Sequence, residues 1–275
     1  MLKELQNVFD SAIKSLEVMY VMRGMKPCTR ILADIQKKGS YLAFLKRHQL
    51  HAEESDFLIK KDDSKGYSDK GTILPKGAAE GYAFLYIARE QAIAKKAKMH
   101  EHQQEHIALG EVLGYPACCC RFFARHYDTQ SQKSNDYTLL ALDNSTSRPF
   151  PYETNIAMRH FDISLLSHFP CSYHCAASIA IAKKHLAVVR SENERTAERI
   201  LKMLRNTILY HESGILVLIG AVLAGNMLSY GQVDATMHHP LLEKLRDAGS
   251  VEIIDSHTFR IGGEECSDFG VMVFA

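Results

Sequence analysis

Apolar side chains in the N-terminal part of the chain follow a helical period. One stripe consists of Leu5, Val8, Phe9, Ile13, Leu16 and Tyr20. Spacings of three and four residues place side chains on one face of a helix, so residues 1–60 are predicted to be helical, with a second helix at 41–59. Residues 77–112 are also predicted to be helical. Between these segments, residues 60–76 are polar and contain glycines, which predicts a loop and a domain boundary.

The later part of the chain changes from helical to strand-like patterns. Two helices are predicted at residues 172–190 and 191–207, after a loop-rich segment at 128–151. After Tyr210, short apolar runs alternate with glycine turns, which is typical of strands. The predicted strands are residues 215–219, 221–230, 251–255, 258–261 and 271–274, with a short helix at 241–247. The sequence therefore predicts an α+β fold with a mostly helical body and a small antiparallel C-terminal sheet.

This pattern divides the chain into three regions. We expect an N-terminal helical region at residues 1–75, a helical core at 76–209 and a small β-rich region at 210–275. The chain has 275 residues, which is long enough to bury a core without needing a metal or a disulfide merely to fold.

Composition and charge exclude several classes of protein. Hydrophobic residues make up 46% and charged residues 24%, as in folded globular proteins. The formal net charge of +1 gives no reason to expect a nucleic-acid partner or an anionic membrane. The most apolar segment, residues 214–228, is too short and too often interrupted to span a bilayer. With no secretory signal pattern at the N-terminus, we expect a cytoplasmic protein.

The seven cysteines carry the strongest chemical signal. In a reducing compartment, clustered cysteines indicate metal or redox chemistry more often than structural disulfides, and the odd count argues against complete pairing. Five of them fall in two blocks, residues 114–120 and 168–175. Cys28 and Cys266 lie outside these blocks and are expected to be packing residues. Cys120 is expected to point to another helical face than the two cysteines before it.

Each block has cysteines next to a proline where a helix is expected to start. We place Pro116 in a first helical turn and Ser172 at an N-cap, which puts Cys118, Cys119 and Cys175 near helix N-termini. The free N–H groups there, with the helix dipole, favour negative charge and lower a thiol pKa. We therefore predict that the blocks converge, with the Cys119 sulfur within about 7 Å of the sulfur of Cys171 or Cys175, the span of a metal or cluster site.

The type of metal is less strongly determined by spacing. Adjacent side chains diverge, which makes it awkward for Cys118 and Cys119 to hold one small ion, whereas a cluster offers several irons. The leading hypothesis is therefore an iron–sulfur cluster, most simply 4Fe–4S, bound by Cys118, Cys119, Cys171 and Cys175. Tetrahedral zinc is the alternative, although neither block has the Cys-x-x-Cys spacing of a zinc ribbon. Metal-free reactive thiols and simple buried cysteines also stay open.

Three histidines are candidates for supporting roles. His106 precedes the first block on a predicted helix and is a candidate metal ligand. His168 and His174 flank Cys171, and either is a candidate proton donor, ligand or thiolate-stabilising imidazolium. We prefer His168 as the catalytic candidate because it precedes the predicted helix start.

The two blocks together resemble the signature of a little-characterised prokaryotic family. That signature is Leu-Gly-Tyr-Pro-x-Cys-Cys, followed later by His-x-Pro-Cys-Ser-x-x-Cys and a helix of small residues. In this chain the matching segments are residues 113–119, 168–175 and 176–178. The resemblance implies that the four cysteines form one unit, and it brings no established reaction.

The function predicted from these features is that of a metal protein. The leading hypothesis is an iron–sulfur enzyme that performs redox or sulfur-transfer chemistry with a small-molecule substrate or a redox partner, although catalysis itself is left open. One alternative is a non-catalytic module with structural zinc that works through partner binding. The other is a metal-free thiol redox protein that uses an exchangeable disulfide. No Walker loop, dinucleotide fingerprint or His-Glu-x-x-His motif is present.

Overall fold

A computed structural model describes residues 1–61, 71–236 and 239–275. Helices hold 43% of the described residues and strands hold 25%. The strands of the described residues form three antiparallel sheets, of four, five and four strands, and one of these sheets lies in the N-terminal region. The prediction of a mostly helical body with one small C-terminal sheet is therefore wrong, and the fold is a mixture of helices and three sheets spread through the chain.

The N-terminal sheet replaces much of the predicted helix. Its strands are β1 (Cys28–Asp34), β2 (His51–Lys61), β3 (Gly71–Pro75) and β4 (Tyr82–Ala88), in the order β1-β4-β2-β3. The run Tyr-Ala-Phe-Leu-Tyr-Ile-Ala forms β4, which pairs with β1 over its whole length and with β2 on its other edge. β4 is a central strand, and most of its side chains are buried, so its sequence is almost continuously apolar. A short apolar run of this kind shows neither the helical nor the strand period, and it therefore does not tell a strand from a helix.

Helices cover this sheet and continue from it. The N-terminal stripe is divided into α1 (Leu2–Phe9) and α2 (Ala12–Met22) because Asp10 adopts a left-handed conformation and Ser11 caps the second helix. The predicted helix at 41–59 is α3 (Lys38–Arg47) followed by β2. After β4 come α4 (Gln91–His102), which packs on β2 and β4, and α5 (His106–Val112).

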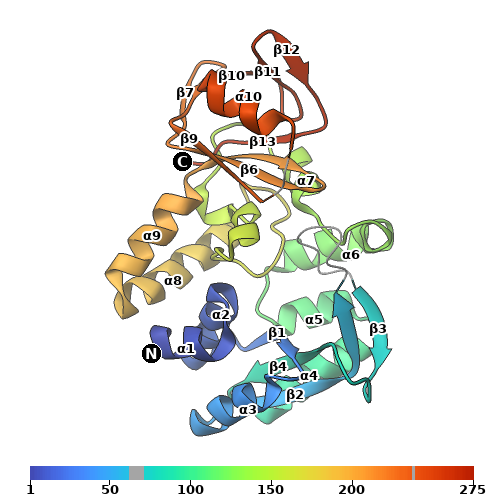
Figure 1. Cartoon of the computed structure of the whole chain (residues 1–275). Helices are drawn as coiled ribbons and strands as arrows, with labels where there is room; N and C mark the ends of the chain where they lie inside the picture. The colour runs from blue at the N-terminus through green and yellow to red at the C-terminus, as the bar shows by residue number, and fades with distance from the viewer. Residues whose placement is uncertain (62–70, 237–238) are drawn as a thin grey trace.

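The middle of the chain carries both cysteine blocks. It contains α6 (Ala117–Gln132), α7 (Thr138–Asp143), the short 3₁₀ turns η2 (Tyr152–Thr154) and η3 (Ala157–Phe161), α8 (Ala176–Glu192) and α9 (Glu194–Leu204). The predicted loop at 128–151 is thus interrupted by the end of α6 and by α7. In Figure 1, α6 and α8 lie between the N-terminal sheet and the C-terminal sheets, which occupy opposite ends of the molecule.

Two sheets form the C-terminal region. One has the order β13-β5-β6-β9, and its strands are β5 (Thr207–His211), β6 (Gly214–Ile219), β9 (Gln232–Ala235) and β13 (Gly270–Met272). The other has the order β12-β11-β10-β8-β7, and its strands are β7 (Val222–Ala224), β8 (Met227–Ser229), β10 (Ser250–Ile253), β11 (Phe259–Ile261) and β12 (Glu264–Cys266). The helix α10 (Leu241–Ala248) precedes β10.

Residues 221–230, predicted as one strand, form a hairpin of β7 and β8 instead. Gly225 has a φ of 64° in the two-residue turn between them.

The hydrophobic core joins these parts. One cluster of buried residues includes Leu2 and Phe9 near the N-terminus, Tyr173 beside the second cysteine block, and Phe274 near the C-terminus. Phe150 forms a bridge to Phe274, so the last residues of the chain hold the segment that follows α7. The second cysteine block therefore lies against a core built from both ends of the sequence.

Candidate metal centre

The first cysteine block is positioned by a tight helix-to-helix turn. α5 ends in a Schellman motif, in which the Gly114 N–H donates to the Glu111 carbonyl at 3.0 Å and the Tyr115 N–H donates to the Gly110 carbonyl at 2.9 Å. Gly114 takes a φ of 81°, which only glycine adopts without strain. Pro116 is then the N-cap of α6, so Cys118 and Cys119 are its second and third residues. The prediction that Cys118 and Cys119 lie at a helix start is confirmed, whereas Pro116, predicted in the first turn, lies one position before it.

The second block is positioned differently from the prediction. α8 begins at Ala176, and Cys175 itself is the N-cap, so the assignment of Ser172 as N-cap is wrong. Ser172 instead closes a turn, since its hydroxyl accepts from the His174 N–H at 3.1 Å and its carbonyl accepts from the Cys175 N–H at 3.0 Å. A serine hydroxyl can accept a nearby backbone N–H both in a turn and at a helix N-cap, so the same residues are compatible with either. The turn and the cap differ only in the residue at which the helix begins.

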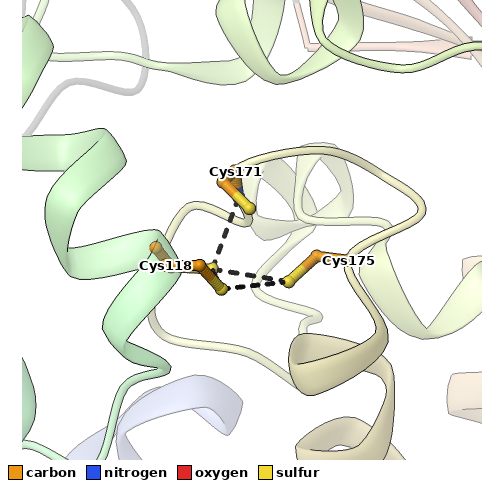
Figure 2. A group of neighbouring side chains, drawn as sticks. Cys118, Cys171 and Cys175 are labelled. Atoms are coloured by element: carbon orange, nitrogen blue, oxygen red, sulfur yellow. Dashed lines mark hydrogen bonds between the residues drawn. The ribbon is translucent and has the colours of Figure 1, made fainter.

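The four predicted cysteines converge on one point. The Cys118 and Cys119 sulfurs are each 3.7 Å from the Cys175 sulfur and 3.9 Å from each other. With Cys171 included, the four sulfurs all lie within 4.8 Å of one another. Figure 2 shows Cys118 on α6 and Cys171 and Cys175 on the other segment, with their side chains directed toward a common centre. The predicted meeting of Cys119 with Cys175 is confirmed.

Burial of the four cysteines is uneven. Cys119 is only 2% exposed, whereas Cys118, Cys171 and Cys175 are each half-buried. The Cys119 sulfur also receives the backbone N–H of Cys171 at 3.4 Å and lies 3.3 Å from the Ser178 hydroxyl. Because N–H and O–H donors stabilise negative sulfur, Cys119 lies in a site suited to a thiolate ligand.

The thiols affect one another's protonation. Hydrogen bonding from Cys119, together with Ser178, lowers the pKa of Cys175 to about 4. The same hydrogen bond, with burial, raises the pKa of Cys119, and burial together with Cys175 raises the pKa of Cys171 to about 12. One thiolate therefore forms readily and disfavours the next through repulsion. A bound cation offsets this repulsion, and metal ligation requires the deprotonated form.

His168 supports the site from behind. It is 8% exposed, and its Nε2 lies 2.9 Å from the Ser178 hydroxyl, so a chain of hydrogen bonds runs from His168 through Ser178 to Cys119. Burial lowers the pKa of His168 to about 3. His168 is therefore a neutral imidazole at pH 7 and does not supply a positive charge to a thiolate.

The structure does not bring the other candidates to the sulfur group. The centroid of the His106 ring lies 3.8 Å from that of the Tyr127 ring, with the rings tilted by 37°, and His106 is not among the grouped ligand residues. The His174 Nε2 lies 2.8 Å from the Ser147 carbonyl. Cys120 lies against Gly110, and Cys28 and Cys266 are buried elsewhere.

Ser178 is the site residue that the sequence argument missed. It is fully buried, and it contacts both Cys119 and His168. Its position three residues after Cys175 puts both on one face of the first turn of α8, a spacing that the sequence already contains.

No protein-family model, curated protein or solved structure matches this chain. Among the helices that the structure describes, none has the length and apolar character needed to cross a lipid bilayer.

Replacing Gly114 should destabilise the protein by straining the turn that joins α5 to α6. In Gly114→Ala, the new Cβ would lie 2.9 Å from the Pro27 Cδ in a left-handed conformation. We expect a loss of roughly 1–2 kcal/mol in the free energy of unfolding, measured by chemical denaturation. Gly77→Ala is the matched control, since its Cβ would meet nothing within 4 Å. Equal stability of the two variants would contradict the strain argument.

Proposed function

We propose that Cys118, Cys119, Cys171 and Cys175 bind one tetrahedral metal ion, with zinc(II) as the metal. The observation that supports this proposal is the spacing of the sulfurs. Zinc binds thiolate sulfur at about 2.3 Å, which gives an edge of about 3.8 Å for a tetrahedron of sulfurs. Three of the sulfur–sulfur edges are 3.7, 3.7 and 3.9 Å, and no edge exceeds 4.8 Å.

The same spacing argues against the iron–sulfur cluster that the sequence favoured. A cluster places several irons and bridging sulfides between the thiolates, so its terminal sulfurs lie further apart than sulfurs that share one ion. The neighbouring Cys118 and Cys119 were expected to diverge, but their sulfurs are 3.9 Å apart, which suits one ion. The chemistry of the donor set, four thiolates, also suits zinc.

We infer that the centre is structural and not catalytic. Four thiolates complete a tetrahedron and leave no open position for water or substrate, which is the arrangement of structural zinc sites. The ion would join the start of α6 to the start of α8 and to the loop that carries Cys171. The negative charge that remains after four thiolates bind one divalent ion is offset by the helix N-terminus of α6 and by the Cys171 N–H.

A metal-free thiol redox protein is the second candidate. Its support is that the Cys175 sulfur, with a pKa of about 4, lies 3.7 Å from each of two other cysteine sulfurs. A thiolate beside a second thiol is the arrangement that thiol–disulfide exchange uses. Membership of the prokaryotic family with the paired cysteine signature is part of either proposal, because the signature cysteines are the residues that meet here.

Metal analysis tests the proposal directly. Protein purified without chelators should contain one zinc per chain, no labile sulfide and no visible colour. Replacing zinc by cobalt(II) should give the intense visible absorption of a tetrahedral tetrathiolate site. Brown protein with stoichiometric labile sulfide would establish a cluster instead. Metal-free protein with a reversible disulfide between these cysteines would establish the redox alternative.

Substitutions of the ligand cysteines should remove the metal selectively. We expect Cys119→Ser and Cys175→Ser to lose bound zinc and to unfold at a lower temperature, because the joined segments are released. Cys266→Ser is the control, since that cysteine is buried in a separate cluster in the C-terminal region. Zinc content per chain and thermal unfolding measure both effects. Full zinc occupancy in all three variants would refute the ligand assignment.

Removing the Ser178 hydroxyl should weaken metal binding without emptying the site. Outer hydrogen bonds to a ligand typically contribute about 10–100-fold to metal affinity. We expect Ser178→Ala and His168→Ala each to lower zinc affinity within that range, with a smaller effect for His174→Ala, because only the first two belong to the chain that reaches Cys119. Competition with a chromophoric chelator measures the affinity. Complete loss of zinc in His168→Ala would show that His168 is a ligand.

A further inference from the structure

A cleft lies beside the metal centre, between the segment after α7 and the second C-terminal sheet. It has a volume of about 380 Å³, within the range of small-molecule sites. One wall is formed by Ser145, Thr146, Ser147 and Arg148, and the other by the β7–β8 hairpin and the end of β10. None of the ligand cysteines lines the cleft, so it is separate from the metal site.

Arg148 is the one ionised side chain among the residues that line this cleft. Arg148 is half-buried, and its Nη1 donates to the Asp255 carbonyl oxygen at 2.9 Å. Within the described chain it forms no ion pair with a carboxylate. The nearby Asp255 carboxylate accepts the His257 N–H at 2.7 Å instead. Burial lowers the pKa of Arg148, with Asp255 acting in the opposite direction, as expected for a cation that has lost water and gained little compensation.

Unused donors surround this cation. A guanidinium has five N–H donors in a planar fork that suits carboxylate and phosphate groups. The hydroxyls of Thr146, Ser147 and Ser256 also line the cleft and make no hydrogen bond to another residue in the described parts of the chain. Positive charge with free N–H and O–H donors is the chemistry that recognises an oxyanion.

The opposite wall is apolar. Leu223 is half-buried, and Ile254 is 42% exposed at the rim of the cleft. An inorganic anion would leave this surface in water. A ligand with a hydrocarbon portion next to its anionic group would cover it.

The polar wall is also tied to the loop between two ligand cysteines. The Ser145 hydroxyl lies 3.2 Å from the Ser172 hydroxyl and accepts the Tyr173 N–H at 2.8 Å. The Ser147 carbonyl lies 2.8 Å from the His174 Nε2. These contacts hold the wall in place from the side of the centre, so the cleft does not depend on an isolated surface loop.

We propose that this cleft binds a small organic anion, with its carboxylate or phosphate group on Arg148 and its hydrocarbon portion on Leu223 and Ile254. The proposal does not depend on which metal the cysteines hold. The hydroxyls of Thr146 and Ser147 complete the oxyanion contacts. Carboxylate and phosphate share the recognition chemistry, and the probes below distinguish them.

Binding is tested by titrating the full-length protein, as purified, with hexanoate, hexyl phosphate and neutral hexanol. Backbone amide shifts locate the site, and calorimetry gives the dissociation constants. We expect at least one anion to bind with a millimolar or lower dissociation constant and to shift residues 145–148 and 223–226. Hexanol should bind at least tenfold more weakly. The anion that binds more tightly identifies the preferred group.

Two substitutions make the test specific to Arg148. Arg148→Gln should weaken binding of the anion at least tenfold, whereas Arg246→Gln, on an exposed arginine paired with Glu243, should not. Thr146→Asp keeps Arg148 but places a carboxylate beside it. This variant should bind the anion at least tenfold more weakly than Thr146→Asn, which has no added charge. Thr146 is exposed, so both variants should retain the fold. The proposal is overturned if neither anion binds, if hexanol binds equally well, or if Thr146→Asp and Thr146→Asn bind alike.

Discussion

The mutual repulsion of four sulfurs is the constraint on which this structure depends. Thiolates within 4.8 Å of one another are stable only with a cation between them or with protons on most of them. The sulfurs lie at two helix starts, with Cys118 and Cys119 in the first turn of α6 and Cys175 at the N-cap of α8. The N-terminus of a helix favours negative charge, so this placement offsets part of the repulsion. The Schellman turn at the end of α5 fixes the direction in which α6 begins.

A buried ion pair connects the N-terminal region to this arrangement. Lys26 pairs with Glu17 where both side chains are at most 6% exposed, and Lys26 also donates to the Ser167 hydroxyl at 2.8 Å, one residue before His168. The Thr29 hydroxyl donates to the same Glu17 carboxylate at 2.7 Å. Removing one partner of such a pair leaves an uncompensated buried charge and is typically destabilising by about 3–5 kcal/mol. The segment leading into the second cysteine block is thus held by α2 and β1.

The site was easier to predict from the sequence than the fold. The convergence of Cys119 with Cys175 followed from local chemistry, since both blocks place cysteines at helix starts. The strand β4 was missed because its burial comes from β1, whose residue Cys28 pairs with Ala88, sixty positions later in the chain. A local pattern contains no information about such a distant partner. The Ser172 prediction is wrong for a local reason, because a turn and a helix cap share one sequence signature. The approach of Cys118 to Cys119 depends on a distant residue, since both sulfurs lie 3.7 Å from that of Cys175.

The two halves of the cysteine group are 52 residues apart, from Cys119 to Cys171. In an unfolded chain the two segments are separate, one with three thiols and one with two. Neither segment alone can supply the four thiolates of the folded site, so each holds a metal more weakly. Under the proposed function, metal would therefore bind tightly only after α6 and α8 have come together, and the zinc content would report that the middle of the chain has reached its native arrangement. A newly made chain would not compete with other proteins of the cell for metal until that step was complete.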